Sequence, residues 1–245
     1  MPHIEIAAEP ILRLSWITLT NTLLMSAVAV LILVSLAFFL FRKPSLIPSG
    51  IQNAFEMLME MILGMMEGVF GARERAERYF PFVATIFFFV LLSNWLGILP
   101  GIGSIGFYES VDGHEKFVPF FRSAASDINF TLALGISAVV AVHVFGIAAI
   151  GATHHASKFF SFKSPIEFFV GILEFISEIA KMISFSFRLF GNVFAGEVLL
   201  VITGFLIPYL IPVPFLMLEI FVGFIQALVF AMLTMVFTSI ATSRH

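Results

Sequence analysis

The side chains best suited to chemistry in this sequence are charged and amide groups set within long apolar runs. Arg188 lies in the largely apolar and otherwise uncharged stretch Ile183 to Phe194. The same helical stripe carries four further charged residues and one amide: Glu167, Glu174, Glu178, Lys181 and Asn192. A charged side chain near the middle of a bilayer costs about 2.5–3.5 kcal/mol on insertion scales. Groups kept at that cost predict ion or proton movement.

These polar positions share one face of a helix. At about 100° per residue, positions 167, 174, 178, 181, 188 and 192 fall within an arc of about 80°. Glu219 and Gln226 are seven residues apart on the last apolar run and also share a face. Two facing helices can therefore present carboxylates, which exchange protons, and amides, which hold water, to each other.

Structural explanations exist for part of this column. Glu178 and Lys181, three residues apart, can form an ion pair within one helix. Asn192 can hydrogen-bond to Gln226 simply to hold two helices together.

Two glutamates are harder to explain as structural. Glu197 and Glu219 have no obvious basic partner in the sequence around them other than Arg188. We therefore expect these two carboxylates to be functional.

Composition identifies the class of protein. Hydrophobic residues make up 60% of the 245 residues and charged residues 12%, and the mean hydropathy is +1.05. These values are typical of an integral membrane protein. The net charge of −3 gives no reason to expect a nucleic-acid partner, and the absence of cysteine excludes disulfides and thiol chemistry.

Hydropathy predicts an all-α membrane protein that forms a single integral membrane domain, residues 1–245, with about five membrane-embedded helices. Each apolar run is long enough to cross roughly 30 Å of hydrocarbon. The first lacks a basic leader and a cleavage site, so we expect a retained helix. The last two exceed a perpendicular span and predict a long tilted hairpin, turned at Pro208, Pro212 and Pro214. The predicted spans are 16–41, 80–99, 130–151, 165–206 and 215–242.

Between the first two spans, residues 51–70 place apolar side chains on one helical face and glutamates largely on another. This pattern predicts an interfacial amphipathic helix. A methionine-rich groove for a partner is the alternative interpretation.

Basic residues set the expected orientation, because they are enriched in cytoplasmic loops. They concentrate after the first span and before the hairpin: Arg42, Lys43, Arg73, Arg75, Arg78, Lys158 and Lys163. We therefore expect the N-terminus outside and the C-terminus in the cytoplasm.

Two other signals carry little weight. The G-x-G-x-x-G string at 101–106 follows a membrane helix rather than a strand, so we do not expect a nucleotide site. His154 and His155 lack further metal ligands at suitable spacing and are expected in a solvated loop. His143 is expected to be packed or hydrogen-bonded.

The segment around the arginine resembles a known family. The run Ser186-Phe187-Arg188-Leu189-Phe190-Gly191-Asn192, followed by Ala195-Gly196-Glu197, is similar to the signature of subunit a of F-type ATP synthase. Further matches are Asn94, the run Ala125-Ser126-Asp127-Ile128-Asn129-Phe130-Thr131, and Gln226-Ala227. The resemblance covers most of the chain.

The resemblance implies a non-catalytic stator subunit in the membrane sector of the ATP synthase. Two offset aqueous half-channels would pass protons to and from the carboxylates of the rotor c-ring, coupling ion movement to rotation and ATP synthesis. The implied partners are the c-ring, the peripheral-stalk b subunits and membrane lipid, within a multi-subunit complex of a cell inner membrane, most simply a bacterial one. No cofactor, metal or catalytic residue is implied.

The resemblance also implies residue roles. Arg188 would face the rotor carboxylate, and the remaining roles fall into three groups. The outer half-channel would contain Asn192, Glu197, Glu219 and Gln226, its wall Asp127 and Asn129, and the cytoplasmic half-channel Glu174, Ser177 and Lys181. Some relatives have histidine at the position of Glu219, so the pH response of proton entry need not copy theirs.

Two other functions fit an Arg-Glu pair in a membrane. A stand-alone cation antiporter or channel would often show an internal repeat with paired broken helices, and none is evident. A membrane scaffold predicts that neutralising Arg188 harms assembly rather than ion flux.

Overall fold

The computed structural model describes residues 8–13, 18–42, 50–111, 114–157, 159, 164–207 and 210–243. Five helices in this part of the chain are long and apolar enough to cross a membrane, which confirms the predicted all-α membrane fold. They are α1 (Asn21–Phe41), α3 (Arg73–Gly97), α4 (Ile128–Ile150), α6 (Pro165–Leu206) and α7 (Pro212–Thr242). Helices are required because lipid offers the backbone no hydrogen-bond partners.

The helix α3 begins at Arg73 rather than at the predicted residue 80 and continues through Pro81. Proline removes one backbone donor from a helix. The chain nevertheless stays helical around Pro81, and the Pro81 carbonyl accepts a hydrogen bond from Thr85 Oγ1 at 2.6 Å. The basic segment at 73–78 is therefore helical. Lys43, Lys158, Lys163 and Pro208 lie outside the described residues.

The chain divides into two compact units. The first unit consists of Met1–Ser45, Phe87–Thr131 and Phe187–Leu228, and the second of Leu46–Ile86, Leu132–Ser186 and Val229–His245. Four helices, α3, α4, α6 and α7, contribute residues to both units. The single-domain organisation stays a prediction.

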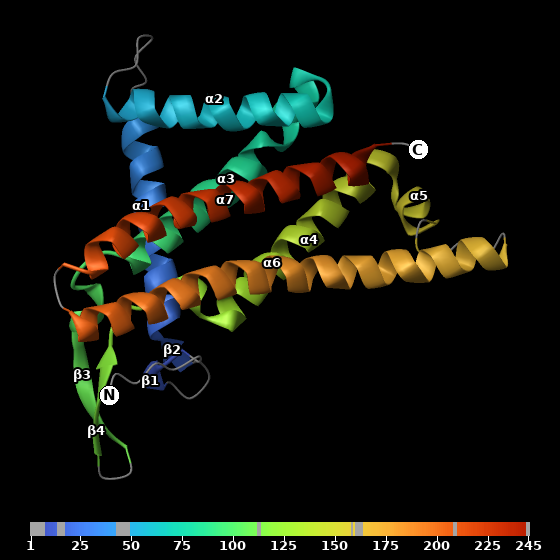
Figure 1. The fold of residues 1–245 in the computed structure, drawn as a ribbon. Coiled ribbons are helices and arrows are strands. Elements are labelled where there is room, and N and C mark those ends of the chain that lie inside the picture. Colours follow the sequence, from blue (N-terminus) through green and yellow to red (C-terminus); the bar gives the residue numbers. More distant parts are fainter. Residues whose placement is uncertain are drawn as a thin grey trace. The chain divides into compact units, whose positions relative to one another are not determined.

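The first unit combines α1 with parts of the long helices and two short antiparallel ribbons. Met25, Ala29 and Leu96 form a buried apolar cluster that joins α1 to α3. Strand β1 (Pro10–Arg13) pairs with β2 (Thr18–Thr20), and β3 (Gly106–Val111) pairs with β4 (His114–Pro119). Figure 1 shows the β3–β4 hairpin after the end of α3. The 3₁₀ turns η1 (Ile102–Ser104) and η2 (Ala124–Ser126) flank the hairpin.

Polar contacts fix the starts of α1 and α4 in the first unit. Thr20 Oγ1 accepts from the backbone N–H of Leu23 at 3.3 Å and so caps α1. The buried Asn21 amide donates to the carbonyl of Pro119 at 3.4 Å. Thr22 Oγ1 donates to Asp127 Oδ2 at 3.0 Å, which ties the start of α1 to the residue before α4.

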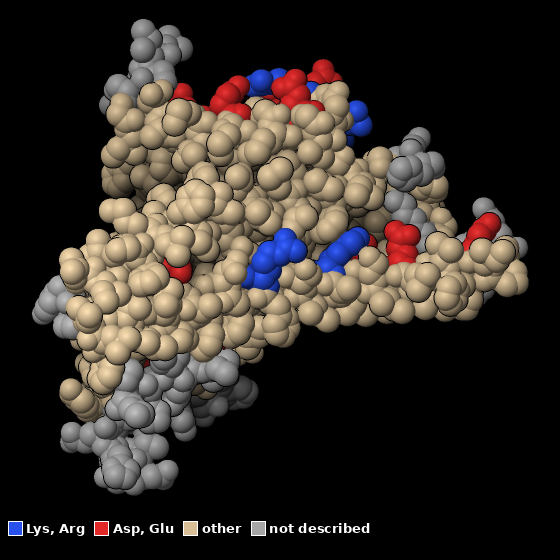
Figure 2. All heavy atoms as spheres, viewed as in Figure 1, with Lys and Arg blue, Asp and Glu red and all other residues tan. Residues whose placement is uncertain are grey.

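The second unit contains the amphipathic helix α2 (Ile51–Phe70), which matches the predicted range. Its buried residues include Ile62, Met66 and Phe70, so the apolar face packs within this unit. Phe70 stacks on Tyr79 of α3, with ring centroids 5.4 Å apart. Figure 2 shows acidic and basic side chains gathered over α2 and the start of α3. Arg73, for example, contacts Glu60 and Glu77 there.

Helices α4 and α6 approach closely in the second unit at Gly135. A Cβ atom at this position would lie 2.6 Å from Ser186 Oγ and 3.1 Å from the carbonyl oxygen of Met182. The contact therefore requires a residue without a side chain.

We expect Gly135→Ala to destabilise the protein by about 1–3 kcal/mol, because extra atoms in a packed contact force neighbours apart. The measurement is the temperature of thermal unfolding of the purified complex in detergent. The control is Gly64→Ala in α2, where a Cβ has no neighbour within 4 Å. Equal unfolding temperatures for the two variants would contradict the close packing.

Candidate functional site

Arg188 lies on the exposed side of α6. Its neighbour Phe187 is 57% exposed, whereas Ser186 and Leu189 are fully buried. The helix thus buries one face and presents a guanidinium beside apolar side chains on the other. Such an arrangement places a permanent positive charge on a membrane helix surface.

Asn192 and Gln226 meet across α6 and α7 in the first unit. Asn192 Nδ2 donates to Gln226 Oε1 at 2.7 Å, and the Gln226 side chain is buried. The expectation that these residues face each other is confirmed. Their part in a proton path stays a prediction.

Glu197 has a basic partner that sequence reasoning missed. Arg122 Nε donates to Glu197 Oε1 at 3.1 Å, and Arg122 Nη2 reaches Oε2 at 3.4 Å. Arg122 is 8% exposed and Glu197 31%. The expectation that only Arg188 could serve these glutamates is therefore wrong for Glu197. The partner comes from the segment between β4 and η2, 75 residues away along the chain, where sequence spacing gives no signal.

Glu219 of α7 packs its carboxyl group directly over Gly196 of α6, in the first unit. Gly196 is buried and has no Cβ that would occupy this space. The absence of a side chain at Gly196 therefore allows the Glu219 carboxyl group to lie against α6 at the residue before Glu197. The helices α6 and α7 thus carry two carboxyl groups, those of Glu197 and Glu219, and two amides, those of Asn192 and Gln226.

Two further predicted positions have structural contacts. Asn94 Nδ2 donates to the Gly223 carbonyl at 3.1 Å, which ties α3 to α7. Asp127 is buried, and its Oδ1 accepts from the backbone N–H of Asn129 at 2.9 Å. Asp127 thus caps α4, whereas the Asn129 side chain is exposed. A role for Asp127 and Asn129 in a channel wall stays a prediction.

The predicted cytoplasmic residues lie on α6 in the second unit. Glu174 and Ser177 are exposed, and Lys181 is partly buried. Lys181 Nζ donates to Glu178 Oε1 at 2.6 Å, so the expected intrahelical ion pair is confirmed. Lys181 Nζ also lies 4.6 Å from the centre of the Phe237 ring.

The histidines differ from expectation. Residues Ala152–Ser157 form the short helix α5 rather than a loop. His154 is exposed, but His155 is 6% exposed and hydrogen-bonds to His143, so the solvated position is wrong for His155. The hydrogen-bonded role expected of His143 is confirmed. Within the described ranges, no group of three or more potential ligands is arranged to hold a metal ion.

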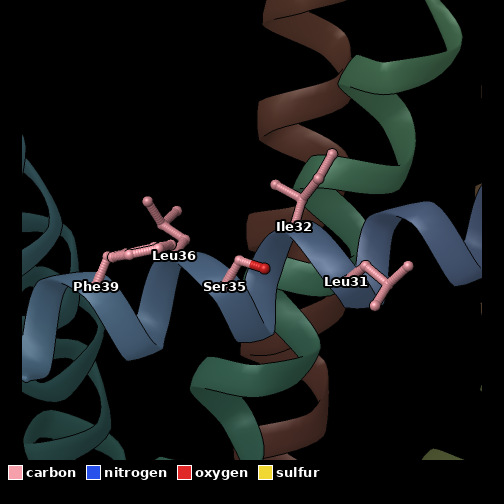
Figure 3. Close-up of a pocket in the computed structure, with 5 residues that line it drawn as sticks. All are labelled: Leu31, Ile32, Ser35, Leu36 and Phe39. Atoms are coloured by element: carbon pink, nitrogen blue, oxygen red, sulfur yellow. The ribbon is translucent and has the colours of Figure 1, made fainter.

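A shallow pocket on α1 carries no titratable group. It is lined by Leu31, Ile32, Ser35, Leu36 and Phe39, all on that helix (Figure 3). Its apolar lining suits contact with acyl chains rather than chemistry. The glycine string at 101–106 forms the turn η1 after α3, without the strand that a nucleotide site needs.

The sequence is similar to those of known proteins along most of its length. A family model described as "ATP synthase A chain" matches residues 23–239. ATP synthase subunit a of Mycobacterium ulcerans (strain Agy99) is 36% identical over 225 residues, 90% of this chain and 86% of the relative. The corresponding protein of Moorella thermoacetica is 32% identical over 235 residues, 96% of this chain and 95% of the relative. That of Campylobacter jejuni (strain 81-176) is 34% identical over 215 residues, 86% and 85% of the two chains.

The Arg122–Glu197 contact generates a stability prediction. We expect Arg122→Gln and Glu197→Gln each to lower stability, because each leaves its partner's charge partly buried. The double variant should lose less stability than the two single variants lose together. The difference, which is the coupling energy, should be about 1 kcal/mol, within the range for residues in contact. Thermal unfolding of the three variants in detergent measures this coupling.

The matched control is the exposed pair Arg73–Glu77, at 51% and 55% exposure. The same glutamine cycle there should give at most about 0.5 kcal/mol, as is usual for solvated pairs. Additive effects at Arg122 and Glu197 would show that these two side chains do not interact.

Proposed function

The chain belongs to the ATP synthase A chain family, and from this membership we propose that it is the proton-conducting stator subunit of a rotary ATP synthase. The family is that of the membrane sector of a multi-subunit complex, and the chain is a multi-pass membrane protein. We propose that it performs no ATP chemistry itself. Its proposed partners are the rotor c-ring and the peripheral-stalk b subunits.

The exposed position of Arg188 on α6 is the observation that carries this proposal. Exposed apolar side chains, including Phe187 and Ile183, lie on the same helix. A guanidinium that faces lipid would be costly, so we infer that this face of α6 lies against another protein subunit rather than against lipid. A ring of carboxylate-bearing helices is a suitable subunit, because its carboxylates attract a guanidinium.

The chemistry of this contact follows from electrostatics. A positive charge within about 4–6 Å of a carboxyl group lowers the carboxyl pKa by roughly 1–3 units. Arg188 would therefore make a passing rotor carboxylic acid release its proton. It would also repel cations that might otherwise cross without turning the ring. Each charge moved through 100 mV is worth about 2.3 kcal/mol, which biases rotation when summed over several steps.

The outer half-channel is proposed to run along α6 and α7 in the first unit. Support comes from the carboxyl groups of Glu197 and Glu219 and from the Asn192–Gln226 hydrogen bond. Carboxyl groups can relay protons, and amides can orient water between them. We add Arg122 to the proposed residues of the outer half-channel, because its ion pair with Glu197 holds that carboxylate in place.

The cytoplasmic half-channel is proposed along α6 in the second unit, at Glu174, Ser177 and Lys181. The second unit also contains α2 and the basic start of α3, where the positive-inside rule expects the cytoplasm. The proposed orientation is therefore N-terminus outside and C-terminus inside, in a bacterial inner membrane. Each half-channel would then be built within one unit.

The test is ATP-driven acidification of inverted membrane vesicles that contain the assembled complex. We expect Arg188→Ala to abolish acidification, because the rotor carboxylate would no longer be forced to release its proton. Immunoblotting of the purified complex checks that the variant assembles.

Arg73→Ala is the matched control, because Arg73 is exposed and its ion pairs are solvated. It should pump like the unmodified protein. Normal pumping by Arg188→Ala would refute the rotor-facing role, and loss of assembly without loss of specific activity would favour a scaffold.

A further inference from the structure

A chain of four ionisable side chains runs through the second unit, and three of them have no place in the proposed half-channels; the fourth is Lys181. His143 Nδ1 and His155 Nε2 are 3.0 Å apart. His143 Nε2 lies 3.5 Å from Glu178 Oε2, and Glu178 Oε1 accepts from Lys181 at 2.6 Å. The order His155, His143, Glu178, Lys181 therefore joins α5, α4 and α6.

The exposed fraction varies along this chain: His155 is 6% exposed, and the side chains of His143, Glu178 and Lys181 are 25%, 14% and 26% exposed. His155 and Glu178 are therefore largely shielded from solvent, whereas His143 and Lys181 are partly accessible. A proton on the buried His155 ring passes to the neighbouring imidazole more readily than into solvent.

Packing holds the two imidazoles in position. The His155 ring lies against Gly146 of α4, where a Cβ would come within 2.7 Å of its Cε1 atom. Phe159 contacts both rings edge-on, with centroids 5.8 Å from His143 and 5.9 Å from His155.

The α7 side of the chain is uncharged among the described residues. Phe237 lies against Lys181, and the Ala241 carbonyl oxygen lies near the same Gly146 position. Among the described residues, Glu178 contacts His143 directly, and Lys181 contacts Glu178.

We propose that His155, His143 and Glu178 form a proton relay, with Lys181 linking it to the cytoplasmic half-channel. Imidazole is suited to this role because it exchanges protons near neutral pH. Two neutral imidazoles in hydrogen-bond contact share one N–H···N bond and can accept one extra proton between them, since a second extra proton would place two positive charges side by side. This inference rests on the proposed function.

One proton moves through the relay in two transfers. A proton that arrives at His155 Nδ1, an atom buried against Gly146, releases the proton on His155 Nε2 to His143 Nδ1. The proton on His143 Nε2 then passes to the Glu178 carboxylate, which becomes the acid and hands it onward. One proton enters and one leaves, and the reverse transfer or a reorientation of the rings restores the starting tautomers.

The test measures ATP hydrolysis by the complex in vesicles made permeable to protons by an uncoupler. Only the hydrolysis that is blocked by carbodiimide modification of the rotor carboxylate is counted, because it is coupled to proton passage. A positioned side chain that transfers protons contributes about 10²–10⁴-fold, and water can replace part of this, so His155→Ala should slow coupled hydrolysis by about tenfold. Added imidazole should restore the rate.

His154→Ala is the matched control, since this residue is adjacent on α5 but exposed. It should hydrolyse ATP at the unmodified rate. His143→Gln and Glu178→Gln should slow hydrolysis as His155→Ala does, which tests the relay even if one variant fails to assemble.

Several results would overturn the relay. One is an unchanged rate of coupled ATP hydrolysis in His155→Ala and His143→Gln. A second is a slow His155→Ala variant whose rate added imidazole does not restore. A third is the failure of all three relay variants to assemble. Arg188→Ala in the same vesicles, assayed for acidification before the uncoupler is added, separates the two proposals. If Arg188→Ala fails to acidify the vesicles while the relay variants behave like the unmodified protein, the stator function stands and the relay is refuted.

Discussion

The rest of this structure depends on the inability of hydrocarbon to solvate polar groups. A buried or lipid-facing donor, acceptor or charge must find its partner within the protein. On α7, Thr234 and Thr238 are buried and donate to the carbonyls four residues earlier, at 2.8 and 2.7 Å. A longer polar side chain can reach a partner on another element. Glu197 of α6, for example, pairs with Arg122, which lies outside that helix. The polar contacts thus decide which elements lie side by side.

Much of the architecture follows from the sequence because membrane helices have a simple signal. Apolar length predicts the five long helices, and a period of 3.6 residues predicts which side chains share a face. Asn192 and Gln226 met as expected because each lies on the polar face of its own helix. The same reasoning explains why the amphipathic α2 was predictable over its whole length.

What periodicity cannot supply is the identity of a neighbour from elsewhere in the chain. Arg122 is in a loop, so no helical pattern connects it with Glu197. His155 lies in a six-residue helix, too short to show a period, and its burial depends on Gly146 of another helix. The start of α3 was missed for a different reason. Charged residues and Pro81 resemble a loop locally, but the following apolar turns stabilise the helix back to Arg73.

The length of α6 has a mechanical consequence. Its 42 residues extend about 63 Å at about 1.5 Å per residue, roughly twice the thickness of the hydrocarbon layer. An apolar helix of that length has to lie obliquely, so it crosses an upright neighbouring helix at a steep angle. Helices that cross steeply touch over only a turn or two, which keeps the contact area small. Under the proposed function, a rotor helix that crosses α6 in this way would slide past it without breaking an extensive interface.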